Sequence, residues 1–201
     1  MPKVIDHDER RRQVSAAAGR IVADEGTDAL TIRRVAEALD CSTAVVSYYF
    51  RDKDELLLHT YRTSALDARA RISAIEERDP GDVRGILHAI LPLDRVRADA
   101  WKIWLSFFGI ALGRPELSAE QQQRILATEV TVERALRVAS SRGDLAPGLD
   151  LGAEAKALLG LAIGIAAQAS FDPRRWTRAA QIRAIDDALL RLQPGGAGPC
   201  R

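Results

Sequence analysis

Residues 42–50 read STAVVSYYF, and the interpretation of the fold depends on this short stretch. Most of its residues, including Val45, Val46, Tyr48 and Tyr49, are of types that favour β-strands. The sequence on both sides instead shows the three- and four-residue spacing of apolar side chains that is typical of helices. We therefore predict a helix that follows an N-cap at Ser42 and whose strand-like preferences are overridden by its context.

Helix periodicity continues along the chain, and strand patterns are almost absent. Val14, Ala18 and Ile21 recur at helical spacing, Gly26 is a stop signal, and further turn signals such as Asp79-Pro80-Gly81 divide the rest. The predicted helices cover residues 8–25, 32–39, 43–50, 53–78, 82–91, 94–112, 118–142, 152–171 and 175–192, and residues 194–201 are expected to form a disordered tail. The fold class is therefore all-α, with about nine helices.

The second and third predicted helices are short and are joined by only two or three residues, which is helix-turn-helix geometry. The turn needs a residue that tolerates a left-handed backbone, and Asp40 occupies that position. In such a motif the third helix lies in the major groove of DNA. Val46 and Phe50, four residues apart, should face the small core and leave the opposite face of the helix for DNA.

The span from Arg10 to Leu58 resembles the DNA-binding domain of the tetracycline-repressor (TetR) family. The residues in register with the family pattern are Thr31, Val35, Ala36, Leu39, Ser42, Val46, Tyr49, Phe50, Lys53 and Leu56. Within that family, STAVVSYYFRDKDELL is similar to the BetI branch, and the later stretch WKIWLSFFGIAL is similar to an aromatic segment of the same branch. The resemblance implies a repressor in which an effector bound among the C-terminal helices changes the separation of two DNA-binding heads.

The predicted DNA-binding residues are Thr31, Arg33, Ser42, Thr43, Ala44, Ser47, Tyr48, Tyr49 and Lys53. By resemblance, Tyr49 and Lys53 contact phosphates that flank the third helix. Thr43, Ala44, Ser47 and Tyr48 are the base-reading candidates by their position on that helix. The hydroxyl and backbone N–H of Thr31, at a helix N-terminus, can reach a phosphate, and Arg33 and Arg34 could reach the DNA backbone.

Three positions depart from the usual family pattern, because Asp40 and Ala44 replace glycines and Ser47 replaces a tyrosine. Since positions 43–48 face the groove, these departures bear on which operator sequence is bound.

The segment is also not basic overall, because acidic residues outnumber basic ones by two among residues 1–55. DNA binding is therefore inferred from the motif and not from the charge.

Several other classes of function lack support. The two cysteines, Cys41 and Cys200, form no disulfide framework or zinc spacing, and His7, His59 and His88 are scattered residues expected on the surface or in packing. No nucleophile-elbow or phosphate-loop motif is present, so we predict no enzyme, cofactor or metal. The N-terminus lacks an apolar signal segment, and the apolar run 157–167 is too short to span a bilayer, which favours a cytoplasmic protein without a membrane partner.

The helix predicted at 94–112 is rich in aromatic residues. Trp101, Trp104 and Phe108 share one face at a spacing of three and four, and Phe107 lies beside them. The interpretation that we favour is core packing. The alternatives are an apolar effector pocket, which with Tyr61 would comprise Tyr61, Trp101, Trp104, Phe107 and Phe108, and a cage for a quaternary ammonium ion over the indole faces.

The last two predicted helices have the pattern of a partner surface. Small residues recur through 153–167, where they would let another helix approach closely, and apolar residues recur in a seam through 182–192. We predict a homodimer, built as a four-helix bundle, over an ordinary intrachain core. The predicted interface residues are Ala157, Gly160, Leu161, Gly164, Ile165, Ile182, Ile185, Leu189 and Leu192.

The sequence thus predicts a helix-turn-helix DNA-binding domain at 1–53 and an effector-binding and dimerisation domain at 54–193. The predicted function is a ligand-responsive repressor that binds a palindromic operator in double-stranded DNA as a homodimer and is released by a small molecule of unknown identity. The alternative is an all-α carrier or enzyme that uses the helix-turn-helix only for packing, and an activator or nucleoid-type binder is a further rival. A carrier would not need a free face over residues 43–48.

Overall fold

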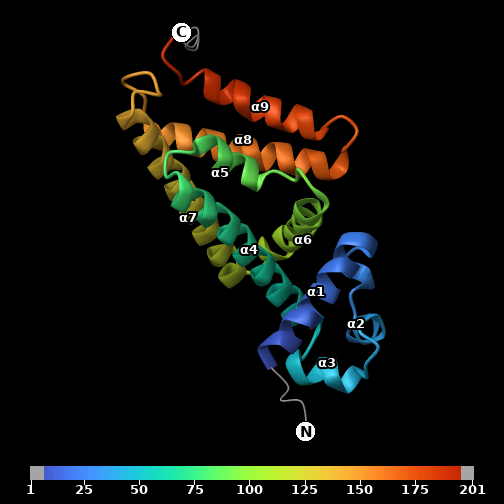
Figure 1. Cartoon of the computed structure of the whole chain (residues 1–201). Helices are drawn as coiled ribbons and strands as arrows, with labels where there is room; N and C mark the ends of the chain where they lie inside the picture. The colour runs from blue at the N-terminus through green and yellow to red at the C-terminus, as the bar shows by residue number, and fades with distance from the viewer. Residues whose placement is uncertain (1–6, 196–201) are drawn as a thin grey trace. The chain divides into compact units, whose positions relative to one another are not determined.

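The computed structural model describes residues 7–195, and within that range it contains nine α-helices, one 3-10 helix and no strand (Figure 1). The elements are α1 (His7–Glu25), η1 (Thr27–Ala29), α2 (Ile32–Ala38), α3 (Thr43–Tyr49), α4 (Lys53–Arg78), α5 (Val83–Ile90), α6 (Arg95–Ala111), α7 (Pro115–Ser141), α8 (Leu151–Phe171) and α9 (Arg178–Leu190). The prediction of an all-α fold is confirmed. Of the predicted tail, residues 196–201 lie outside the described residues.

Capping residues account for where most helices begin. Thr31, Asp82 and Asp150 accept hydrogen bonds from backbone N–H groups in the first turns of α2, α5 and α8. Two predicted starts were wrong by three residues. The helix α7 begins at Pro115 and not at 118, because proline is compatible with the first helical turn, and α9 begins only after its cap at Thr177.

The turn between α2 and α3 is a Schellman motif with an aspartate at its left-handed position. The backbone N–H of Cys41 donates to the carbonyl of Ala36 at 3.0 Å, and that of Asp40 donates to Glu37 at 3.2 Å. Asp40 has a φ of 49°, and within the described range it is the single non-glycine residue with a positive φ. The predicted left-handed role of Asp40 is therefore confirmed. The end of α7 has the same pair of hydrogen bonds, with Gly143 at this position.

The chain divides into two compact units, and α4 and α6 contribute to both. The first unit contains α1, η1, α2, α3, the part of α4 that ends at Asp67, and Asp99–Ile110 of α6. The second contains α4 from Ala68, the start of α6, and α5, α7, α8 and α9. The unit that holds the helix-turn-helix therefore includes more of the chain than the segment 1–53.

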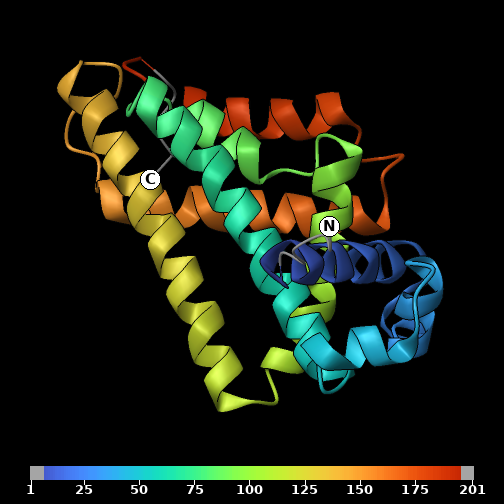
Figure 2. The same cartoon turned by 60° about the horizontal axis from the view of Figure 1, so that its bottom comes forward.

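The second unit is built around α8. The buried side chains of α8 pack against α5, α7 and α9, and Figures 1 and 2 both show α9 running alongside α8. By length and composition alone α8 could cross a membrane, a criterion that core helices of soluble proteins also meet. Arg69 of α4 donates to Thr131 at 3.0 Å, which ties α4 to α7, and it also pairs with Glu76 of its own helix at 3.0 Å.

The conformation of Asp40 leads to a stability prediction. Asp40→Val should lower the free energy of unfolding by about 1–2 kcal/mol, because a β-branched residue fits the left-handed region poorly. Asp40→Gly should be as stable as the wild type or more so, since glycine has no Cβ to oppose a positive φ. Urea unfolding of the full chain measures both, with Asp40→Asn as the control that tolerates this conformation. Equal stability of the valine and asparagine variants would contradict the prediction.

Candidate nucleic-acid interface

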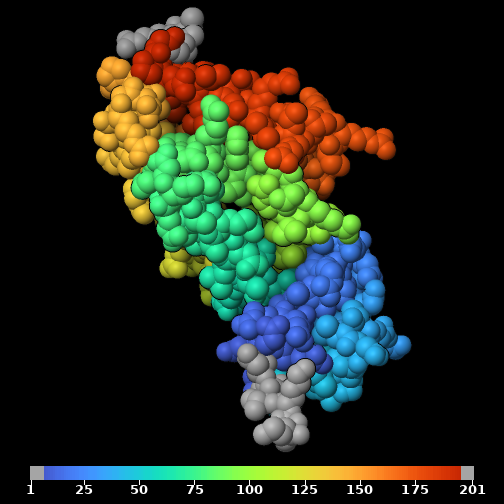
Figure 3. Space-filling view, in the orientation of Figure 1, coloured from blue at the N-terminus to red at the C-terminus, as the bar shows by residue number. Residues whose placement is uncertain are grey.

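The helix α3 has one face in the core and one in solvent. Val46 is fully buried, and Phe50, directly after the helix, is 1% exposed, as their spacing predicted. The side chains of the opposite face are exposed, and they are Thr43, Ala44, Ser47 and Tyr48. All four candidate base readers therefore lie on the open side of α3. Figure 3 shows α1, α2 and α3, blue to cyan, adjoining one another over a continuous surface.

The hydroxyl groups at the starts of α2 and α3 differ in what they bind. The Thr31 hydroxyl accepts a hydrogen bond from the backbone N–H of Arg34 at 3.0 Å, so the predicted cap is confirmed and the hydroxyl proton can still be donated. The predicted N-cap position of Ser42 at the start of α3 is confirmed, but its side chain makes no capping hydrogen bond. The Ser42 side chain is exposed, and its hydroxyl is not used to hold the start of α3.

The two arginines of α2 are held by carboxylates at the surface. Arg33 pairs with Glu37 at 2.9 Å, and Arg34 pairs with Glu25 of α1 at 2.7 Å. The hydrogen bonds and negative charges of these glutamates raise the pKa of both guanidinium groups. Exposed pairs of this kind contribute little to stability, so a phosphate could replace the carboxylate at small cost.

Tyr49 is half-buried and is bound by a residue from the start of α1. Its hydroxyl lies 3.1 Å from Nδ1 of His7, and the ring of His7 lies 5.8 Å from that of Tyr48 and 5.9 Å from that of Tyr49. His7 was expected to have only a surface or packing role. No sequence signal links it to α3, because 42 residues separate the two partners of the hydrogen bond.

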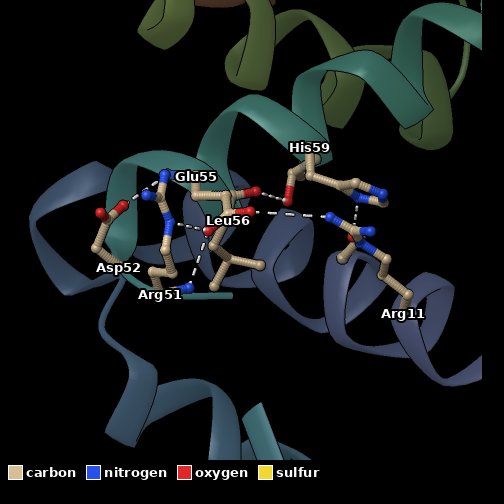
Figure 4. Close-up of polar contacts among 8 residues, drawn as sticks. Arg11, Arg51, Asp52, Glu55, Leu56 and His59 are labelled. Atoms are coloured by element: carbon tan, nitrogen blue, oxygen red, sulfur yellow. Dashed lines mark hydrogen bonds and ion pairs between the residues drawn. The ribbon is translucent and has the colours of Figure 1, made fainter. Parts of the chain in front are cut away.

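Arg51 lies between α3 and α4, and the sequence did not single it out as a DNA-binding residue. Lys53, two residues later, is half-buried at the start of α4. The Glu55 carboxylate accepts from the backbone N–H of Arg51 at 2.9 Å and from its guanidinium at 3.1 Å. These two bonds, the backbone bond first, lower the pKa of Glu55. Figure 4 shows Arg51 and Arg11 on two sides of Glu55, and the Arg51 side chain itself is 85% exposed. An exposed basic group therefore follows α3 closely in the chain.

A histidine lies beneath α3 and joins it to α1 and α4. His59 of α4 (Figure 4) has its Nδ1 2.7 Å from the hydroxyl of Ser15, and its ring meets the edge of the Phe50 ring at 5.2 Å. The guanidinium of Arg11 lies 5.1 Å from the centre of the same Phe50 ring. Burial, and then the positive charges of Arg11 and Arg62, lower the pKa of His59.

The aromatic residues proposed for an effector site lie in the first unit and are mostly buried. Tyr61 and Phe107 are about as buried as side chains can be, and their rings stack at 3.7 Å between centres, so each covers a face of the other. Trp101 is buried against the half-buried Trp104, whose indole N–H donates to the Ser64 hydroxyl at 3.1 Å. Phe108 is half-buried. Trp104 and Phe108 are therefore the members of the set that retain exposed area.

The residues proposed for a dimer interface fall into two groups. Ala157, Gly160 and Leu161 of α8 are exposed, and Gly164 and Ile182 are half-buried. The second group is buried within the single chain, and its members are Ile165, Ile185, Leu189 and Leu192. A Cβ atom placed on Gly160 or Gly164 would meet no other atom within 4 Å, so this part of α8 is open.

No metal site is indicated in the part of the chain that the structure describes. Within residues 7–195, no group of three or more His, Cys, Asp and Glu side chains is arranged to hold a metal ion.

Comparison with known proteins connects both parts of the chain to one family. The family profile described as bacterial regulatory proteins of the tetR family matches residues 15–60, and that described as the C-terminal part of BetI-type transcriptional repressors matches residues 81–194. The transcriptional regulator BetI of Burkholderia cenocepacia is 33% identical over 159 residues, which are 74% of this chain and 80% of that protein. The regulator PksA of Bacillus subtilis is 26% identical over 178 residues, 87% of this chain and 85% of that protein.

Solved structures share the fold at lower identity. A transcriptional regulator from Saccharomonospora viridis in complex with choline has a TM-score of 0.80 at 23% identity, covering 90% of this chain and 95% of that chain. A TetR transcription regulator from Haloarcula marismortui has a TM-score of 0.81 at 19% identity, covering 93% of this chain and 100% of that chain. Both likenesses establish the same arrangement of helices.

The lowered pKa of His59 predicts how stability changes with pH. Below the ordinary histidine pKa of about 6.5, the unfolded chain binds a proton at this residue, whereas the folded chain resists binding it. The contribution of neutral His59 to the free energy of unfolding is therefore complete above that pH and is lost as the pH falls below it. Urea unfolding at about pH 7.5 and about pH 5.5 should show a smaller loss of stability for His59→Asn than for the wild type, because asparagine does not titrate.

The control for this measurement is Ser15→Ala, which removes the hydroxyl beside Nδ1 of His59 but keeps the imidazole, so it should retain a loss of stability between the two pH values. An equal loss in the wild type and in His59→Asn would show that His59 does not resist protonation in the folded chain.

Proposed function

This chain belongs to the TetR family of transcriptional regulators and carries a BetI-type repressor domain, and on that premise we propose that it acts as a homodimer on a palindromic operator and is released by a small-molecule effector. Members of this family bind DNA and are not enzymes. The parts of the proposal that go beyond the family are the residues that contact DNA, the surface that joins two copies and the class of effector.

The observation that carries the DNA-binding proposal is the open face of α3. Val46 and Phe50 are the buried side chains of this segment, and the four candidate base readers are left in solvent. A helix-turn-helix that served only for packing would have no reason to keep this face free of contacts. Groups that can bind phosphate are present at the start of α2, the end of α3 and the start of α4, namely Thr31, Arg33, Tyr49 and Lys53.

The open stripe of α8 supports a homodimer. Ala157, Gly160 and Gly164 are small, so the helix of a second copy could approach closely there, with Leu161 as an apolar contact. Ile185 and Leu189 already fill the core of their own chain, so the contribution of α9 would come from its outer face. A symmetric dimer presents two copies of α3, which a palindromic operator with two half-sites requires.

We propose a small organic cation as the effector. A structural neighbour of this chain is bound to choline, a quaternary ammonium compound, and such cations are attracted to indole faces. Trp104 and Phe108 are the candidate contacts, because Tyr61 and Phe107 cover each other's faces.

In keeping with a regulator that meets DNA and metabolites, we place the protein in the cytoplasm, with 1–53 as the DNA-binding domain and 54–193 as the effector and dimer domain.

The experiment that tests this proposal measures binding to DNA by fluorescence anisotropy. The wild type should bind the DNA upstream of its own gene, or a duplex selected from a random pool, with two chains per palindrome, and Tyr49→Ala/Lys53→Ala should bind every sequence more weakly. Loss of the lysine contact should also reduce the log–log salt slope by about one for each chain, because one fewer counterion is released.

The matched control is Tyr48→Phe, which removes one hydroxyl from the exposed face. It should lower the discrimination between the preferred base and its alternatives by about 0.5–1.5 kcal/mol and leave the salt slope unchanged. If neither the wild type nor the double variant binds any duplex, the proposal fails and the carrier interpretation replaces it. Broad coverage without a short palindrome in a footprint would indicate a nucleoid-type binder.

Choline should dissociate the complex of the protein with its operator. The reason is that an effector which binds one state of the dimer better shifts the population toward that state. Choline chloride is compared with sodium chloride at the same concentration, because salt alone weakens binding to DNA. Trp104→Ala should bind DNA normally and lose the response to choline. Equal dissociation by both salts would contradict a cationic effector.

A further inference from the structure

The start of α1 touches the end of α3 through three rings. The ring centres of Tyr48 and Tyr49 lie 5.0 Å apart and edge to face, and His7 lies within 6 Å of both. The Nδ1 atom of His7 is 3.1 Å from the Tyr49 hydroxyl. His7 is exposed, and no partner for its other ring nitrogen, Nε2, lies among the residues that the structure describes.

This cluster lies where the candidate base reader and the candidate phosphate contact meet. Tyr48 is 72% exposed, so its ring extends from α3 into the region that DNA would occupy. Among the residues from 7 to 195, the hydroxyl of the half-buried Tyr49 makes its side-chain hydrogen bond with His7. The orientation of the Tyr49 hydroxyl therefore depends on a residue from another helix, and the Tyr48 ring contacts the same residue.

The direction of the bond between His7 and Tyr49 depends on the charge of the imidazole. When Nδ1 of a neutral imidazole accepts, the tyrosine must donate its proton to it. In the imidazolium both nitrogens donate, so the hydroxyl accepts from Nδ1 and its own proton becomes available for another acceptor. Nε2 carries a hydrogen in both forms and can donate to a phosphate in either. Protonation frees the tyrosine O–H as a second donor and adds a positive charge.

The groups around His7 are compatible with such a change. Asp8, Glu9 and Arg10 follow it on α1, and the groups that face it from α3 are the two phenols. The helix α3 contains no charged side chain. A phosphate that approached the cluster would therefore meet no opposing charge from α3.

We propose that His7 is a further DNA-contacting residue, which holds the Tyr49 hydroxyl through Nδ1 and donates to an operator phosphate through Nε2. This inference rests on the proposed DNA-binding function and extends the interface from α2 and α3 to the start of α1. Because imidazole gains its charge at mildly acidic pH, the contact makes DNA binding stronger as the pH falls.

The test compares DNA binding by the full chain at about pH 6 and about pH 8, at one ionic strength and over a salt series. For the wild type, the dissociation constant should be about 3- to 10-fold lower at the acidic pH, as expected for an exposed charged contact. The log–log salt slope should be steeper there by about one for each bound chain. His7→Asn places an amide near the position of Nδ1 but cannot titrate, so both differences should disappear.

Two control variants identify the source of any pH effect. His59→Asn removes the other histidine of the first unit and should retain the full change in affinity, provided that circular dichroism shows a folded chain at both pH values. Tyr49→Phe removes the hydroxyl, so it should keep the change in salt slope, which comes from the charge, and lose part of the change in affinity.

The outcomes separate this inference from the proposed function. If the wild type binds no duplex at either pH, the DNA-binding function itself fails. If it binds with an affinity and salt slope that do not change with pH, or if His7→Asn retains the wild-type response, His7 is not a DNA contact and the proposed function stands without it.

Discussion

The orientation of α3 depends on the burial of one aromatic ring. Phe50 follows the last residue of α3 and is enclosed by α1 and α4, since Arg11 lies over its face and His59 meets its edge. A helix of seven residues is too short to be stable alone and must be fixed by its contacts. With Val46 one turn earlier, Phe50 fixes which side of α3 is buried. The exposed side of α3 then carries the four candidate base readers, Thr43, Ala44, Ser47 and Tyr48.

The segments before and after α3 support this arrangement by backbone geometry. Asp40 reverses the chain within a single residue, and its neighbours satisfy the last carbonyls of α2. After Phe50, Glu55 receives the backbone N–H and the guanidinium of Arg51, which holds the entry into α4. The helix α4 then continues beyond Asp67 into the second unit, where Arg69 bonds to α7. One continuous helix thus connects the residues under α3 with those that α7 holds.

The sequence predicted faces and boundaries better than it predicted partners. Periodicity correctly indicated that Val46 and Phe50 are buried, and side-chain caps such as Thr31 marked where helices begin. Spacing also grouped Phe108 with Trp101, whereas the structure buries Phe107 more deeply, because α6 presents more than one side to its neighbours. The contacts of His7 and His59 join residues more than 40 positions apart, and no local pattern records such a pair.

His7 and His59 belong to the same unit, but their proposed roles require opposite charge states. The buried His59 favours the neutral form, so acid weakens the support beneath α3. The exposed His7 lies where a positive charge would strengthen contact with phosphate. Acid therefore improves the proposed interface only while the unit that carries it remains folded. Burial lowers the pKa of His59, so the ring that meets the edge of Phe50 is a neutral imidazole. The same type of side chain thus serves α3 in two ways, as a neutral ring that supports Phe50 and as an exposed ring whose Nε2 can face a phosphate.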